Sequence, residues 1–248
     1  MAIEIPLIGR CAGAPLAAPS EAAKLSRRSH RACTDQIYTL IKNSPRLQIA
    51  AAITEILLAL AVYGSVPTRN IIIWMLVLAV GQAMAIGLYF HYKRNPPQPA
   101  DIEKWYWMLR LRSLLSGIAW GSAAFLLWSP ENPVLQGLLA GALFGIVAGA
   151  MTALPVVPTV FYAFVTPAFL PLIARTAMEG DLLHLCLAGF GLVMFIVLVW
   201  SGYGFSKLTR SARAMRYENL DLIDELGEEK GIAEHSRRTA EFARDEAE

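Results

Sequence analysis

Charged residues are scarce over most of this 248-residue chain, and that scarcity argues against a soluble globular domain. Only 17% of the residues are charged, whereas about a quarter are charged in a typical soluble domain. Residues 47–92 carry only Glu55 and Arg69 as full charges, and residues 113–205 carry only four. Residues 206–248 instead hold 8 Lys and Arg and 11 Asp and Glu. The pattern predicts a body embedded in a lipid bilayer with water-facing ends, and we expect no nucleic-acid partner.

Residues that commonly carry chemistry are also sparse. The three cysteines form no CxxC pair and have no metal-like spacing. A Gly-rich phosphate loop, a nucleophile elbow and a paired acid motif are all missing, so we expect no catalytic residue, cofactor or metal in this chain. His91 falls at the inner end of the second predicted span and His184 at the outer end of the sixth. A membrane about 30 Å thick would separate them, so they cannot share an ion.

Long apolar runs predict an all-α membrane bundle. A membrane-spanning helix needs about 20 largely apolar residues, and proline-containing breaks such as "VPTRN" and "SPENP" separate the runs. Six segments qualify: Leu47–Val66, Asn70–Tyr92, Leu111–Ser129, Pro133–Ala153, Pro158–Ala177 and Leu182–Phe205.

Basic residues predict the orientation. Seven lie in the segment up to Arg46, five lie in or at the edge of the connection between spans two and three, and four lie at the exit of span six, whereas the other breaks hold or border one, none and one. The positive-inside rule makes the basic side cytoplasmic. We therefore expect a multi-pass protein of the bacterial inner membrane with both termini in the cytoplasm, which requires an even number of spans. The expected parts are a cytoplasmic segment 1–46 with an interfacial helix, a transmembrane domain 47–205 and a cytoplasmic helix 206–248.

The tail carries a heptad pattern. With position a at Ala212, the a and d positions form a seam that contains Met215, Asn219, Leu222 and Leu226. Eight of the eleven a and d positions are apolar. This pattern indicates a coiled coil that continues span six and joins two copies of the chain. A single solvated helix is the alternative.

Glycines recur at helical spacing in two predicted spans. Span four contains Gly137, Gly141, Gly145 and Gly149, and span three repeats the spacing with Gly117 and Gly121. Because small residues let helix backbones approach each other, we expect these positions to pack helices within the bundle, with a dimer interface as the alternative.

Glu55 lies near the middle of span one. A carboxylate there costs roughly 2.5–3.5 kcal/mol on insertion scales, so it should face the interior of the bundle. It either senses a ligand, a proton or a signal, or forms a structural hydrogen bond across the bundle, for which Gln82 is the candidate partner.

Two stretches resemble membrane sensor regions of proteobacterial histidine kinases. "LRSLLSGIAWGSAAFLLW" is similar to their third span, with its "lSGl.WG" pattern, and "RYENLDLIDELGEEKGIAEHSRRTAEFARDEAE" is similar to the linker that follows their last span. The candidates for sensing are Glu55, Gln82, Trp120 and His184, of which Trp120 lies within "SGIAWG". It implies a chain cut inside the linker, before a kinase part that would reach a response regulator.

The sequence thus predicts a sensory input module that passes an unidentified stimulus through span six to a dimeric coiled coil. The phosphoacceptor and nucleotide-binding motifs of a kinase do not occur in it. An input module of a cyclase-type (GGDEF) signalling protein, or a small membrane transporter or channel, is the alternative. The transporter is disfavoured because the spans show no clear inverted repeat, and a membrane-embedded enzyme ranks below it.

Overall fold

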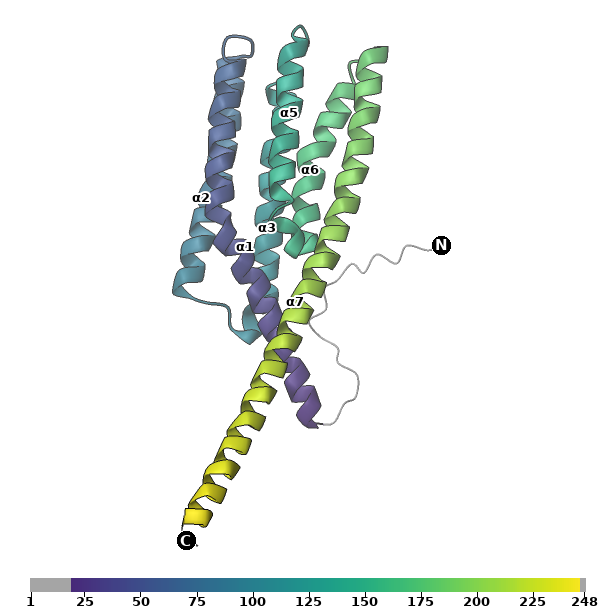
Figure 1. Cartoon of the computed structure of the whole chain (residues 1–248). Helices are drawn as coiled ribbons and strands as arrows, with labels where there is room; N and C mark the ends of the chain where they lie inside the picture. The colour runs from purple at the N-terminus through teal and green to yellow at the C-terminus, as the bar shows by residue number, and fades with distance from the viewer. Residues whose placement is uncertain (1–18, 246–248) are drawn as a thin grey trace. The chain divides into compact units, whose positions relative to one another are not determined.

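The computed structural model describes residues 19–245, and it describes their side chains from Cys33 onward except at scattered positions, most of them in the tail. This part of the chain is helical. Its elements are α1 (Pro19–Val62), α2 (Thr68–Arg94), η1 (Pro99–Asp101), α3 (Ile102–Gly121), α4 (Ala123–Leu126), α5 (Pro133–Ala150), η2 (Leu154–Val156), α6 (Pro158–Ala177) and α7 (Leu182–Asp245). The chain divides into two units, 1–206 and 207–248. The first unit contains the bundle, in which α1, α2, α3, α5 and α6 stand side by side (Figure 1).

Five helical segments of the described residues are long and apolar enough to cross a membrane: Cys33–Val62, Thr68–Arg94, Pro133–Ala150, Pro158–Ala177 and Leu182–Thr209. The predicted third span is the exception. Helix α3 contains Glu103, Lys104, Arg110 and Arg112, and these charges lower its hydropathy. The helix starts at Ile102, directly after Asp101 and ahead of the predicted membrane span, and a break at Ser122 separates it from the single turn of α4.

Helix α1 replaces two predicted elements. An interfacial helix was expected before residue 46 and the first span after it. In the structure, the single helix α1 runs from Pro19 to Val62 with Pro45 inside it. A proline within a helix removes one hydrogen bond and bends the helix, yet need not end it. The predicted boundary at 46 is therefore not a helix boundary.

Local sequence signals set the other helix ends. The side chain of Asn132 accepts hydrogen bonds from the backbone N–H groups of Val134 (3.2 Å) and Leu135 (3.3 Å), and Pro133 occupies the first turn of α5. Both features favour a helix start. The turns before α2 and α7 contain Gly64 and Gly180, with φ of 84° and 80°, a conformation that glycine adopts without steric cost.

The closest helix pair is α3 with α6. A Cβ atom added to Gly117 would collide with the carbonyl oxygen of Phe164, and one added to Gly121 would collide with that of Pro167. Pro171 has no N–H to offer the Pro167 carbonyl, so this oxygen is free to lie against Gly121. Gly117 and Gly121 therefore lie where the backbones of α3 and α6 come close together. Since both α3 and α6 advance in sequence along this contact, the two helices run in the same direction.

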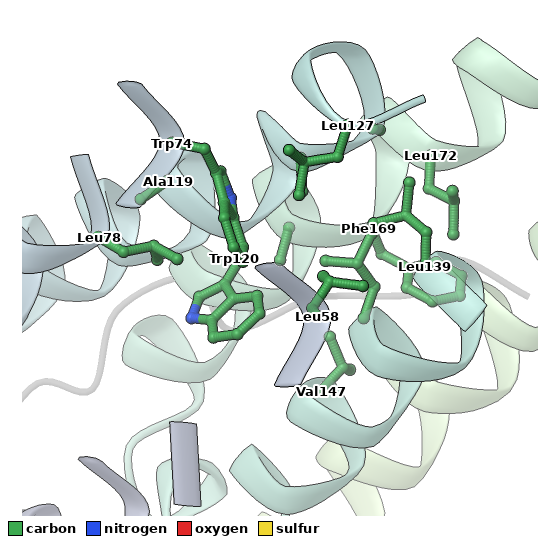
Figure 2. Packing of buried hydrophobic residues seen from close by; sticks show 14 of the residues in the cluster. Leu58, Trp74, Leu78, Ala119, Trp120, Leu127, Leu139, Val147, Phe169 and Leu172 are labelled. Atoms are coloured by element: carbon green, nitrogen blue, oxygen red, sulfur yellow. The ribbon is translucent and has the colours of Figure 1, made fainter. Parts of the chain in front are cut away.

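The main core surrounds this pair. Figure 2 shows Trp74 of α2 beside Trp120 of α3, with aliphatic and aromatic side chains of the other helices around them. The two indole rings meet edge to face at 5.6 Å and 80°, a favourable aromatic geometry. A second cluster joins α1 to the first half of α3 and to the start of α6 through Ile37, Trp105, Leu109 and Val160.

Candidate functional site

An apolar cavity of about 440 Å³ lies between α5, α6 and α7, and we call it the α5–α7 cavity. Cavities of this size that are apolar, with a few polar groups converging on them, are the usual form of small-molecule sites. Its apolar lining includes Phe144 of α5, Leu172 and Ile173 of α6, and Leu187, Phe190 and Met194 of α7. Its polar groups come from Trp128, Gln136, Thr176 and His184.

His184 lies at the polar end of this cavity and joins α7 to α5. Its Nε2 atom is 2.9 Å from Oε1 of Gln136, and its Nδ1 atom faces Oδ2 of Asp181. The Gln136 amide donates through Nε2 to the carbonyl oxygens of Ser129 (3.0 Å) and Pro130 (3.2 Å). Because Nε2 points to these carbonyls, Oε1 is the Gln136 atom that faces the imidazole. Each ring nitrogen of His184 therefore faces an oxygen atom of a neighbouring side chain.

Asp181 starts helix α7 and holds His184 in place. Its Oδ1 atom accepts a hydrogen bond of 2.9 Å from the backbone N–H of His184, as an N-cap residue does. This bond, with further help from the imidazole, keeps the pKa of the exposed Asp181 carboxyl below its usual value. The carboxylate is therefore the form that caps the helix and faces the imidazole.

A second polar cluster closes the same end of the bundle. Nε1 of Trp128 donates to Oε1 of Glu179 at 2.6 Å, and Nη2 of Arg175 lies 2.8 Å from the same oxygen. The Arg175 guanidinium also lies 4.9 Å from the centre of the Trp128 ring, within the range of a cation–π interaction. The cluster links the end of α6 to the connection between α4 and α5.

The sequence analysis selected His184 as a candidate. It did not select the polar residues around it, which are Trp128, Gln136, Arg175 and Glu179. The rarity of charged residues in this part of the sequence could have pointed to them. Arg175, Glu179 and Asp181 are three of the four full charges between residues 113 and 205, and they fall at one predicted break. Gln136 and Trp128 flank the "SPENP" break, which was expected on the same side of the membrane.

Glu55 and Gln82 lie together, as the structural alternative anticipated. Nε2 of Gln82 is 3.5 Å from Oε2 of Glu55, a long hydrogen bond between α1 and α2. Glu55 is buried, and neither residue lines the α5–α7 cavity. The two sensing candidates thus form a pair of their own, separate from His184.

The glycines of α5 differ from those of α3. A Cβ atom added to Gly137, Gly141, Gly145 or Gly149 would meet no atom within 4 Å, so the expected close helix packing does not occur at these positions within the chain. Gly137 and Gly141 line the α5–α7 cavity instead. Equal spacing in the sequence therefore corresponds to a contact in α3 and to open space in α5.

Trp120 and the tail positions lie elsewhere. Trp120 is buried and lines a different cavity, between α1, α3 and α5. Met215, Leu222 and Leu226 are exposed on the tail part of α7, as is Asn219. No group of three His, Cys, Asp or Glu side chains close enough to hold a metal ion occurs among the residues that the structure describes.

Comparison with known proteins gives no relative: no family model, no curated protein and no solved structure matches the chain.

Proposed function

We propose that this chain is the membrane-embedded sensory input module of a histidine kinase-type signalling protein. One observation carries the proposal: helix α7 lines the α5–α7 cavity with its first turns and continues as a single helix from Leu182 to Asp245. A ligand that changes how those turns pack therefore acts on the same helix that forms the charged tail. The likeness of the tail to kinase linkers supports the choice of output, and a cyclase output would use the same device.

The contacts of α7 with α6 suit a movable element. Within the bundle, α7 meets α6 through Gly202 against the Phe161 ring, through a bond of 3.4 Å from the Tyr162 hydroxyl to the Val199 carbonyl, and through the Phe169–Phe195 ring pair at 6.5 Å. Most of its large apolar side chains, such as Phe190 and Trp200, are exposed. Small contacts of this kind can exchange for others at low cost, which is what a population shift between two packings requires.

The proposed stimulus is a small apolar or amphiphilic molecule that enters the α5–α7 cavity and meets His184 and Gln136 at its polar end. Such a molecule would favour one packing of α7 over another by its differential affinity. The tail seam of Met215, Asn219, Leu222 and Leu226 would transmit the change by rotating or shifting against a second copy in a parallel coiled coil.

The proposed topology has six crossings of the bacterial inner membrane, with α3 and α4 as the third. Its support is the parallel course of α3 beside α6, which is itself long and apolar enough to cross. Reporter fusions after Asn95 and after Glu131 test it. If α3 and α4 cross, the first reporter is cytoplasmic and the second periplasmic; reporters on the same side would contradict the sixth crossing.

An insertion series in the tail tests the function. The chain is joined through its tail to a histidine kinase core, and one to seven alanines are inserted after Arg216. Each residue turns a helix by about 100°, so one or two insertions should bias autophosphorylation strongly on or off, and seven should restore regulation because the seam returns to phase. A steady decline with insert length, with no recovery at seven, would show that the tail is a passive tether.

A further inference from the structure

A second cavity also borders α5, and it shares Gly141 with the α5–α7 cavity. It measures about 410 Å³ and is lined by α1, α3 and α5, and we call it the α1–α5 cavity. It is more polar than the α5–α7 cavity because Arg112, Ser113 and Ser116 of α3 and Ser44 and Gln48 of α1 border it. The proposed sensing of a ligand beside α7 does not involve these residues.

Arg112 is an incompletely paired cation beside this space. Its Nη2 atom donates to the hydroxyl of Ser44 at 3.3 Å, while its buried Nε–H has no hydrogen-bond partner among the described residues. None of the side chains lining the cavity in the described part of the chain is acidic. A buried guanidinium without an anion is costly, and its fork of N–H groups matches a carboxylate or phosphate oxygen pair.

The rest of the cavity suits an alkyl chain. Its α5 wall contains Gly141, Gly145 and Gly149, where a Cβ atom would meet nothing within 4 Å. Trp120 lies eight residues beyond Arg112 on α3, which corresponds to about 12 Å along the helix. The space therefore runs from a cationic, hydroxyl-lined end to an apolar end at Trp120.

We propose that the α1–α5 cavity binds an anionic amphiphile, with its oxyanion headgroup on Arg112 and Ser44 and its acyl chain along the α5 glycines toward Trp120. A free fatty acid, through its carboxylate, and an anionic phospholipid, through its phosphate, share this chemistry. The proposal gives the α5 glycines a role that helix packing within the chain does not, since they leave room for the acyl chain.

The test measures equilibrium binding to the purified full chain by native mass spectrometry. Dodecanoic acid and phosphatidylglycerol are titrated separately, with phosphatidylcholine as the neutral comparison. Wild-type protein should bind one or both anionic probes more tightly than phosphatidylcholine, and the preferred probe identifies the source of the headgroup. Arg112→Gln should weaken binding about tenfold or more, since a hydrogen bond to a charged group is lost.

Two further variants separate this site from general effects. Arg110→Gln removes an exposed arginine two residues away, whose Nε donates to the carbonyl of Tyr106, and it should bind as the wild type does. Gly145→Leu keeps Arg112 but fills the apolar part, so it should also weaken binding. Equal affinity for phosphatidylcholine, an Arg110→Gln loss as large as that of Arg112→Gln, or unchanged binding in a folded Gly145→Leu variant would overturn the proposal.

Discussion

Helices α3 and α5 carry glycines at the same spacing, yet these glycines have opposite surroundings. On α3, Gly117 and Gly121 touch the backbone of α6. On α5, glycines at the same spacing border open space, and α7 has only Ala188, Leu198, Gly202 and Ser206 buried between residues 182 and 206. An added Cβ atom therefore collides with the α6 backbone at Gly117 and Gly121, whereas the space beside the α5 glycines can accommodate a ligand or a helix movement.

This contrast assigns different tasks to the two sides. Close backbone packing resists small displacements because dense interiors change between discrete arrangements rather than deform continuously. A cavity bordered by a lightly held helix permits such a change at low cost. We therefore interpret α3 with α6 as the frame and α7 as the element that moves against it.

The largest expected effect comes from placing one methyl group on each side. Gly121→Ala should destabilise the protein by about 1–3 kcal/mol, because the methyl group overlaps the Pro167 carbonyl. Gly137→Ala, on the α5–α7 cavity, should be neutral or stabilise by up to about 1 kcal/mol, because alanine favours the helix and the space is open. Thermal unfolding of both variants in the same detergent measures the difference. Equal midpoints would contradict the contrast between the two sides.

The next effect concerns the cluster that closes the α6–α7 end. Trp128→Phe keeps the ring under Arg175 but removes the N–H that Glu179 accepts. The variant should lose about 1–2 kcal/mol of stability. Trp107→Phe changes an exposed indole and provides the control. If both variants unfold at the same temperature as the wild type, the cluster does not stabilise this end of the bundle.

A smaller effect is expected at Glu55. Because Gln82 already pairs with it, Glu55→Gln should retain a hydrogen bond across α1 and α2, and stability should change by less than about 0.5 kcal/mol. Kinase output of the fusion protein and its pH dependence should also remain as in the wild type. A shifted pH profile in this variant would make Glu55 a sensing residue.

The smallest effect is expected at the exposed cap of α7. The lowered pKa of Asp181 means that its carboxylate stabilises the fold above the unfolded-state pKa, near pH 4, and that this contribution is lost as the pH falls through the lower folded-state pKa. Asp181→Asn should therefore melt slightly below the wild type at pH 7 and level with it near pH 2. A difference that persists at pH 2 would show that the charge of Asp181 is not its source.

Particular elements show what the sequence could predict. Apolar length and proline-containing turns located α5, α6 and the start of α7 to within a few residues, because those signals are local. The continuity of α1 through Pro45 was missed, since what packs around a proline decides whether the helix ends there or continues. The glycine spacing could not distinguish contact from cavity, because the neighbouring helix is a tertiary feature.

The candidate site was predictable only in part. His184 and the Glu55–Gln82 pair were selected from rare polar residues in apolar surroundings. The cluster of Trp128, Arg175 and Glu179, and the partly unpaired Arg112, depend on helices brought together from distant parts of the chain. Neither Glu179 nor Arg112 was selected from the sequence.

The most direct measurement of the central claim is whether filling the α5–α7 cavity changes the output of the tail. Ala140 of α5 lines that cavity, and Ala79 is exposed on α2, so Ala140→Phe and Ala79→Phe add the same side chain to the two environments. In the chain joined to a kinase core, the account predicts that Ala140→Phe shifts autophosphorylation several-fold at unchanged protein level, while Ala79→Phe leaves it as in the wild type. Unchanged activity in a folded Ala140→Phe protein, or equal shifts in both variants, would contradict it.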